Sequence, residues 1–217
     1  MSRGRLILIE GLDRTGKSTQ CDILCEKLNG TLMKFPQRET KIGQLINNYL
    51  TDKSFKMPDQ SIHLLFSANR WEMSEIIQTE LNNGRDVILD RYVYSGIAYS
   101  SAKHISGMDI DWCYQCDKGL IRPDITVFLT NDSNNDDREG FGEERYENIE
   151  FQKVVKLKFY EIFKKLDNLK EGEEAGENGL QIINVTNKNI DEVTGLILER
   201  IQPFLNKKYN GNEFMYF

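Results

Sequence analysis

Short, nearly continuous apolar segments alternate along the chain with longer stretches of helical periodicity. The pattern predicts strands at 6–10, 31–35, 86–90, 125–130 and 181–185. It predicts helices at 17–28, 42–50, 58–83, 93–101, 111–118, 146–169 and 190–207. Strands that are apolar on both faces are typical of a parallel sheet covered by helices on each side. The predicted fold class is therefore α/β, with a five-stranded parallel sheet flanked by helices.

We expect a single domain over residues 1–217, because no repeat and no linker rich in Pro, Gly or Ser divides the chain. Its 217 residues, of which 39% are hydrophobic, are enough to bury one substantial core. The polar segment at 131–144 is too long for an ordinary connection, so we expect a lid over about 131–147. The acidic segment at 171–179 is expected to be a solvated connector.

Composition and charge argue against several classes of partner. A net charge of −6 and the lack of a long apolar run disfavour a nucleic-acid surface, an anionic membrane surface and a membrane span. We expect a soluble protein of the cytoplasm, the nucleus or both, because the N-terminus does not resemble a signal peptide. Its four cysteines, whose spacing also permits a zinc site or a redox pair, are expected to be free and structural: Cys21, Cys25, Cys113 and Cys116.

The stretch from Gly11 to Ser18 matches the phosphate-binding pattern GxxxxGK[ST], between an apolar strand and a helical pattern. Glycines allow the backbone N–H groups to turn inward, and Lys17 supplies a cation to the outer phosphates. Ser18 can give its hydroxyl oxygen to Mg²⁺. A glycine turn that only feeds a helix would not explain Lys17 and Ser18 together. The predicted ligand is a nucleoside triphosphate with Mg²⁺.

Asp13 and Arg14 place opposite charges inside this loop. Arg14 could reach the phosphoryl group in transfer and stabilise its charge. Asp13 repels phosphate, so we expect it to face a hydroxyl, a cation or solvent. Two solvated loop charges are the alternative for either residue taken alone.

Arginines near the ends of predicted elements indicate a second ligand. Arg38 and Arg91 follow two strands, and ligands of an open parallel sheet bind beyond the carboxyl ends of its strands, so the pair predicts a second phosphate site. Phe66 and Arg70 share one helix face and could contact one base, although core packing is the alternative for Phe66. Asp90 ends a strand, where a carboxylate commonly holds Mg²⁺ through water; a salt bridge is the alternative.

Five motifs, EGLDRTGKST, KFPQRETKIG, LLFSANRWE, LDRYVYSGIAYS and GFGEERYENIEFQ, occur in this order between Glu10 and Gln152. Together they resemble the thymidylate kinase family, P-loop enzymes that transfer the γ-phosphoryl group of ATP to dTMP. The resemblance covers roughly two-thirds of the chain and is thin after Leu169. It implies a three-layer P-loop kinase fold with a lid, ATP and dTMP as substrates, Mg²⁺ as cofactor and a homodimer packed through helices.

The resemblance also implies roles for individual residues, with Asp13, Arg14, Lys17 and Arg91 in catalysis. It implies that ATP is bound by Gly11, Leu12, Asp13, Arg14, Thr15, Gly16, Lys17, Ser18, Thr19 and, over the adenine, Arg138. It implies that dTMP is bound by Asp13, Phe35, Pro36, Arg38, Phe66, Arg70, Arg91, Ser95, Gly96, Tyr99 and Gln152. Phe66 would stack on thymine, Arg70 would bond its O4, and Tyr99 would crowd the place of a ribose 2′-hydroxyl. Ser18 and Asp90 would hold the metal.

The lid motif FGEERYE at 141–147, together with Arg14 in the phosphate loop, resembles the eukaryotic members of the family. Arg145 could also close on phosphate, and the acidic run at 132–137 fits no family pattern. The predicted reaction is ATP + dTMP → ADP + dTDP, in which positioning and charge compensation supply most of the rate.

Two other functions compete with this prediction. A kinase for dUMP, CMP, AMP or thymidine would use a similar site, although two arginines argue for an acceptor that already carries phosphate. A P-loop regulatory switch would need no second substrate, and it leaves Phe66, Arg70 and Arg91 unexplained as a set.

Overall fold

Five parallel strands form the central sheet of the structure, a computed structural model that describes residues 2–131, 144–211 and 213–217. The strands are β1 (Leu6–Gly11), β2 (Thr31–Lys34), β3 (Val87–Asp90), β4 (Ile125–Thr130) and β5 (Leu180–Asn184). Their order is β2-β3-β1-β4-β5, and every neighbouring pair is parallel. Because β1 lies between β3 and β4, the segments that follow these three strands meet at one edge of the sheet. The predicted five-stranded parallel sheet is confirmed.

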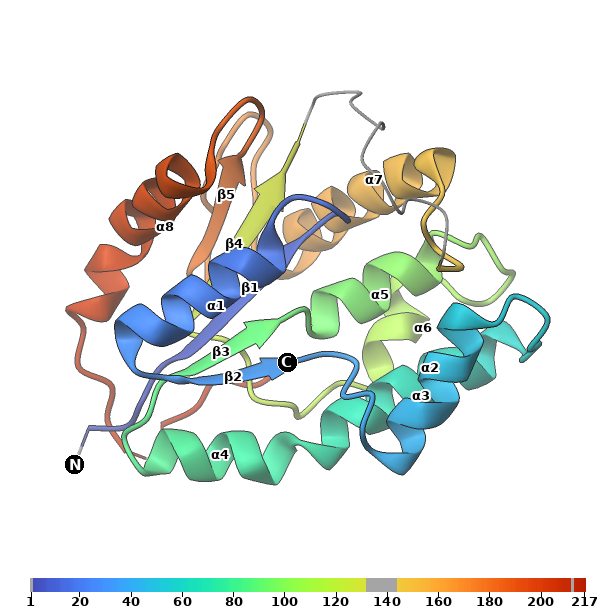
Figure 1. Ribbon diagram of the computed structural model, residues 1–217, viewed down its shortest axis with the longest axis horizontal. Coiled ribbons are helices and arrows are strands. Elements are labelled where there is room, and N and C mark those ends of the chain that lie inside the picture. Colours follow the sequence, from blue (N-terminus) through green and yellow to red (C-terminus); the bar gives the residue numbers. More distant parts are fainter. Residues whose placement is uncertain (1, 132–143, 212) are drawn as a thin grey trace.

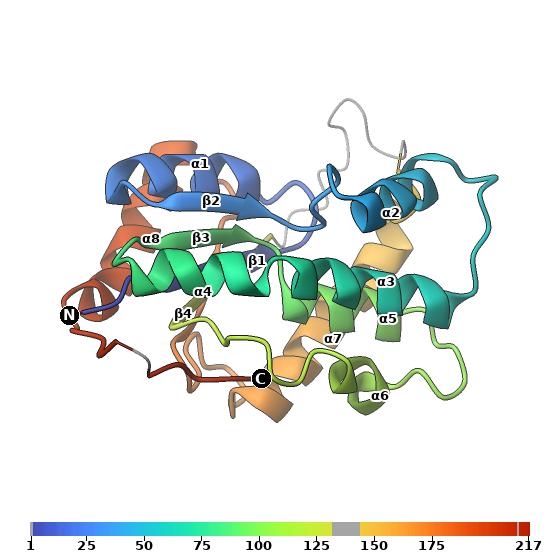
Figure 2. The same ribbon diagram turned by 90° about the horizontal axis from the view of Figure 1, so that it is seen from below.

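Helices cover both faces of the sheet and complete the three layers (Figures 1 and 2). On one face, α1 (Lys17–Leu28) and α8 (Ile190–Leu205) share a core with Ile7 and Ile9. On the other face, α4 (Ser74–Asn82), α5 (Val93–Ser101) and α7 (Ile149–Leu166) share a core with Leu6 and Leu8. These four side chains of β1 are fully buried, and each such burial contributes about 1.5–3 kcal/mol. Alternation along β1 therefore ties both layers to the strand that precedes the phosphate loop.

Two further helices, α2 (Lys41–Thr51) and α3 (Asp59–Glu72), lie beyond the carboxyl ends of β2 and β3 (Figure 2). They pack on each other around a smaller cluster whose fully or nearly buried members are Ile46, Tyr49, Leu50 and Ile62. The short α6 (Ile110–Gln115) packs against α5. These helices form a wall opposite the phosphate loop.

The helix predicted over 58–83 is two helices, so that prediction was wrong at its middle. α3 ends at Glu72 and α4 begins at Ser74, with Met73 between them. The N–H of Met73 donates to the carbonyl of Arg70, only three residues back, and such a tightened turn ends an α-helix. Periodicity did not reveal the break because Met73 is itself apolar and packs against the main core.

The loop before α7 is longer than predicted. α7 begins at Ile149 and not at 146, because the side chain of Asn148 accepts a hydrogen bond from the N–H of Phe151 and caps the helix. α6 likewise ends at Gln115, short of the predicted 118. Residues 144–148 therefore stay outside the helix and remain available to the site.

Candidate functional site

The phosphate loop joins the end of β1 to the start of α1. Gly11 has φ 152°, and a Cβ placed there would come within 2.4 Å of the Leu129 carbonyl oxygen on β4. Gly16, with φ 82°, precedes Lys17, the first residue of α1. Both positions favour glycine because its backbone tolerates positive φ. The loop sequence therefore holds the N-terminus of α1 against the edge where β1, β3 and β4 end.

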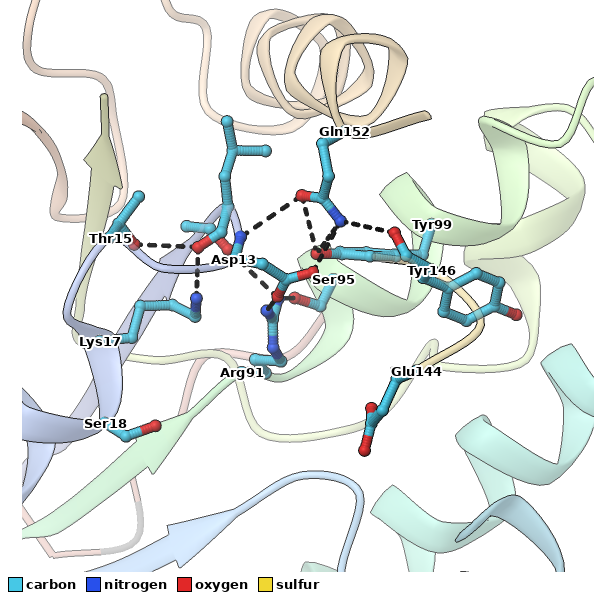
Figure 3. A network of polar contacts seen from close by, with 12 residues as sticks. Asp13, Thr15, Lys17, Ser18, Arg91, Ser95, Tyr99, Glu144, Tyr146 and Gln152 are labelled. Carbon is cyan, nitrogen blue, oxygen red and sulfur yellow. Dashed lines mark hydrogen bonds and ion pairs between the residues drawn. The ribbon is translucent and has the colours of Figure 1, made fainter. Parts of the chain in front are cut away.

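Lys17 lies folded back across this loop (Figure 3). Its Nζ donates to the carbonyl oxygen of Leu12, which also accepts from Thr15 Oγ1 at 3.0 Å. Burial first, and then the nearby positive charge of Arg91, lower the pKa of Lys17 to about 8. The negative charge of a bound phosphate would stabilise the protonated form of Lys17.

Ser18 and Asp90 come together as predicted from their positions after β1 and at the end of β3. Ser18 Oγ donates to Asp90 Oδ2 at 2.6 Å, and Asp90 is 6% exposed. Within the described residues, no group of three or more His, Cys, Asp and Glu side chains is arranged to hold a metal. One hydroxyl and one carboxylate fit Mg²⁺, which takes oxygen ligands, keeps several waters and completes its shell with substrate phosphates.

One pocket, which we name the donor pocket, opens beside the start of α1. From the loop and α1 it is lined by Arg14, Thr15, Gly16, Thr19 and Gln20, and from the segments after β4 and β5 by Asn131, Val185, Asn187, Lys188, Asn189, Ile190, Asp191 and Val193. Sequence reasoning missed the second group. Asn189 and Glu192 form a capping box at the start of α8, so the pattern N-x-x-E after an apolar strand was the available signal.

A second pocket, the acceptor pocket, lies on the other side of the loop, toward α2, α3 and α5. Ten of its lining residues were predicted, namely Asp13, Phe35, Pro36, Arg38, Phe66, Arg70, Arg91, Ser95, Gly96 and Tyr99. Sequence reasoning missed the others, Leu50, Tyr92, Ser100, Glu144, Tyr146 and Glu147. Three of those, Glu144, Tyr146 and Glu147, fall within the predicted lid of about 131–147, in its last residues.

A network of four side chains closes one end of the acceptor pocket (Figure 3). Arg91 forms a salt bridge with Asp13, and Arg91 Nη1 donates to the Gly11 carbonyl oxygen at 3.2 Å. Gln152 Nε2 donates to Asp13 Oδ2 at 2.7 Å and lies 3.3 Å from the Tyr99 hydroxyl. The guanidinium of Arg91 sits over the Tyr99 ring, 5.2 Å from its centroid. Asp13 therefore faces a cation and an amide. Gln152 does not line the pocket itself but contacts three residues that do, Asp13, Tyr99 and, through its carbonyl oxygen at 3.1 Å, Tyr146.

Arg38 stands at a different wall of the acceptor pocket. It donates to Asn47 Oδ1 at 2.8 Å and forms a salt bridge with Glu144 at 2.8 Å. Both partners of the salt bridge are more than one-third exposed, so this pair contributes little to stability. An anionic ligand in the pocket could replace Glu144 as the partner of Arg38, because their salt bridge is exposed to solvent.

Phe66 and Arg70, one turn apart on α3, both line the acceptor pocket. Phe66 is half-buried and packs against the cluster between α2 and α3, so it serves core packing and lines the pocket as well. Arg70 is 3% exposed and forms a salt bridge with Asp117 at 2.6 Å.

Sequence reasoning missed the role of Glu10, the acidic residue that directly precedes Gly11 in the otherwise apolar strand β1. It is fully buried, and its carboxylate accepts from the N–H groups of Tyr92 and Ser95 and from Ser95 Oγ. Burial raises the pKa of Glu10, while the Ser95 hydroxyl and the charge of Arg91 oppose that rise. Its carboxylate ties β1 to the first turn of α5. A lone acidic residue inside an apolar strand was the signal.

Arg145 is engaged with the end of α2. Its guanidinium donates to the carbonyl oxygens of Tyr49, Asp52 and Phe55 at 2.7–2.9 Å and lies 4.1 Å from the centroid of the Tyr49 ring. This set of contacts fixes residues 144–148 beside the acceptor pocket. Arg138, predicted over the adenine, and the acidic run at 132–137 lie outside the described residues.

The remaining predictions concern thiols and membranes. The four cysteines are free, as predicted. No helix in the described part of the chain is long and apolar enough to cross a membrane.

Comparisons with known proteins agree with each other. The family model for thymidylate kinase matches residues 9–197. A thymidylate kinase of Schizosaccharomyces pombe is 45% identical over 207 residues, which cover 92% of each chain. A thymidylate kinase of Dictyostelium discoideum is 44% identical over 204 residues, covering 91% of this chain and 84% of the relative. The solved structure of thymidylate kinase from Candida albicans matches with a TM-score of 0.87 and 46% identity, covering 100% of this chain and 99% of that one.

Proposed function

The chain belongs to the thymidylate kinase family, and we propose that it transfers the γ-phosphoryl group of ATP to dTMP, giving ADP and dTDP for dTTP synthesis in DNA replication. The observation that carries this proposal is the division of one loop between two pockets. Asp13 lines the acceptor pocket, whereas Arg14, the next residue, lines the donor pocket. Two substrates bound in these pockets would meet at the phosphate loop.

The charges of the acceptor pocket support a nucleoside monophosphate as the second substrate. Arg91 lies beside the phosphate loop and Arg38 on a neighbouring wall, so an acceptor phosphate between them would point toward the donor. Phe66 and Arg70, which line the same pocket from α3, would receive the base by stacking and by hydrogen bonding. Asp13, released in part from Arg91 by the incoming phosphate, would accept from the sugar 3′-hydroxyl. These residues position two ionised substrates, which is most of what phosphoryl transfer requires.

Arg14 and Lys17 are the proposed cations of the transfer step. Lys17 lies on α1 at the loop and would move its Nζ from the Leu12 carbonyl to the outer phosphates. Arg14 has φ 66°, a backbone angle that costs about 1–3 kcal/mol in a residue other than glycine and is typical of functional loops. That angle turns the chain so that Arg14 lines the donor pocket. Both cations would offset charge on the phosphoryl group during transfer.

Ser18 and Asp90 would hold Mg²⁺, Ser18 directly and Asp90 through water. An ion held there would offset negative charge on the outer phosphates of ATP. The chain's own contribution is to bring a hydroxyl and a carboxylate within 2.6 Å of each other beside the phosphate loop.

We further propose a single domain with a lid at about 131–147, a homodimer, and residence in the cytoplasm, the nucleus or both. The dimer proposal is supported by exposed apolar side chains on α2 and α3, Leu45 at 43% and Leu64 at 48%. Light scattering coupled to size-exclusion chromatography would decide it, since a mass of one chain at micromolar concentration contradicts the proposal.

The function is tested by ADP release from purified protein with ATP, Mg²⁺ and a panel of acceptors. We expect dTMP to give the highest kcat/KM, dUMP a lower value, and AMP, CMP and thymidine the lowest. Chelation of the metal should abolish release with every acceptor. An acceptor-independent rate, or a rate with AMP above that with dTMP, would overturn the assignment.

A further inference from the structure

Behind the acceptor pocket, the carboxylate of Asp117 holds the guanidinium group of Arg70 along one edge. Asp117 Oδ1 accepts from Arg70 Nε at 3.1 Å, and Oδ2 accepts from Nη2 at 2.6 Å. The side chain of Asp117 is fully buried and that of Arg70 is 4% exposed. This bidentate geometry fixes the plane of the guanidinium as well as its position.

The turn that carries Asp117 is itself held by α3, the helix that carries Arg70. Ser67 Oγ lies 2.8 Å from Asp117 Oδ1 and 3.0 Å from the carbonyl oxygen of Cys116, and Trp71 Nε1 donates to the same carbonyl at 2.8 Å. One stretch of α3 therefore supplies the arginine and anchors its partner. The carboxylate receives three donors, as a buried carboxylate needs.

On its other side the guanidinium lies against Gly96 of α5. A Cβ at position 96 would come within 2.6 Å of Arg70 Nη2 and 2.7 Å of Nη1. Glycine at this position lets the flat group rest on the helix backbone. Arg70 is thus confined between the carboxylate of Asp117 and the backbone of α5.

One edge of the guanidinium remains for a ligand. Nε and Nη2 are bonded to Asp117, whereas Nη1 has no hydrogen-bond partner in the described part of the chain. Arg70 lines the acceptor pocket. An arginine nitrogen only donates hydrogen bonds, so this edge favours a carbonyl oxygen and disfavours an amino group.

We propose that Asp117 is a positioning residue that sets acceptor specificity, because it holds Arg70 so that Nη1 reads a carbonyl group on the pyrimidine base. A carbonyl at C4, as in thymine and uracil, accepts from Nη1, whereas the C4 amino group of cytosine cannot. Asp117 also balances the charge of Arg70 within a buried ion pair. This inference rests on the proposed function, in which the acceptor base lies at Arg70.

Asp117→Asn tests the proposal, because it keeps the size of the side chain but removes the charge and one acceptor oxygen. We expect KM for dTMP to rise about 10- to 100-fold, the loss typical of a charge-assisted hydrogen bond. The kcat and KM for ATP should stay within about threefold of the wild type. The ratio of kcat/KM for dTMP over dCMP should fall about tenfold or more, and Asp117→Glu should recover part of both losses.

Asp167→Asn is the matched control. Asp167 is an equally buried carboxylate that holds an arginine, with Arg122 Nη2 donating to Oδ1 at 2.7 Å, and it does not line the acceptor pocket. We expect this variant to lower the melting temperature without changing the dTMP to dCMP ratio. Equal changes of that ratio in both variants would assign the effect to general loss of structure and overturn the proposal.

If Asp117→Asn does not fold, a second variant that displaces Arg70 and leaves Asp117 unchanged can still test the proposal. Gly96→Ala pushes the guanidinium off α5, and we expect it to give the same rise in KM and the same loss of discrimination. A folded Asp117→Asn or Gly96→Ala protein with wild-type KM and ratio overturns the proposal. Failure of the proposed function is distinguishable, because the wild type itself would then fail to use dTMP.

Discussion

Arg91, directly after β3, forms a salt bridge with Asp13 of the phosphate loop, 78 positions earlier in the chain. The pair joins the phosphate loop to the segment after β3 within the lining of the acceptor pocket. Gln152 of α7 completes the contact by donating to the same carboxylate. In the proposed function, an acceptor phosphate at Arg91 would compete with Asp13 of the phosphate loop for the guanidinium group.

Arg14→Ala should lower kcat by about 10³-fold or more and leave KM for dTMP within about twofold, because Arg14 lines the donor pocket and not the acceptor pocket. Steady-state kinetics with both substrates varied would measure this. Lys188→Ala, which removes another cation from the donor pocket, is the control and should raise KM for ATP with a much smaller effect on kcat. Equal losses in kcat and dTMP affinity would move Arg14 to a binding role.

Tyr99→Ala should relax discrimination against ribonucleotides. The Tyr99 ring lies beneath the Arg91 guanidinium and lines the acceptor pocket, where in the proposed function it would occupy the space of a ribose 2′-hydroxyl. We expect the ratio of kcat/KM for dUMP over UMP to fall about tenfold or more. Tyr99→Phe keeps the ring and removes only the hydroxyl near Gln152, so it should retain the wild-type ratio. A loss of discrimination in Tyr99→Phe as large as in Tyr99→Ala would show that the hydroxyl, and not the ring, excludes ribose.

ATP binding should take up a proton at alkaline pH. Burial lowers the pKa of Lys17 to about 8 in the protein without nucleotide, and bound phosphate raises it again. Above pH 8 the free protein carries mostly neutral Lys17, so ATP affinity should weaken as pH rises from 7.5 to about 9. Calorimetry in two buffers of different ionisation enthalpy measures the uptake. Lys17→Arg cannot lose its proton, and its binding should show no such uptake; equal heats for the wild type in both buffers at pH 8.5 would contradict the assignment.

His63 should stay neutral down to about pH 4. It is fully buried and lies 2.8 Å from Ser100 Oγ and 2.9 Å from the Cys113 carbonyl oxygen, and burial lowers its pKa to about 4. Unfolded chains protonate histidine near pH 6.5, so unfolding takes up a proton between those values. Stability should therefore fall by about 3 kcal/mol as pH drops from 6.5 to 4.

Nuclear magnetic resonance can follow that titration, because the chain holds only two histidines. The exposed His104 gives the second resonance, and a His104→Gln variant assigns the pair. A midpoint for His63 above pH 6 would show that its ring can be charged inside the folded protein.

Local chemistry made much of this protein predictable. Continuous apolar runs required strands covered on both faces, and GxxxxGK[ST] between a strand and a helix required a phosphate loop. Glu144 and Tyr146 were harder to place. They lie before α7 because the side chain of Asn148 caps the N-terminus of that helix through a backbone N–H, so the helix begins only at Ile149. The break at Met73 was also missed, because an i→i−3 hydrogen bond leaves no mark on hydrophobic periodicity.

The sequence by itself determined the parallel sheet, the phosphate loop and ten of the residues that line the acceptor pocket. The sheet and the loop follow from patterns of neighbouring residues, and Arg38 and Arg91 follow from the rule that strand ends share one edge. Phe35, Pro36, Ser95, Gly96 and Tyr99 were implied by the resemblance to the thymidylate kinase family. Only the tertiary structure decided which distant residues meet: Asp13 with Arg91, Glu10 with Ser95, and Arg70 with Asp117. Those pairings follow from strand order and from the packing of α3 and α5, which bring together groups that no sequence spacing relates.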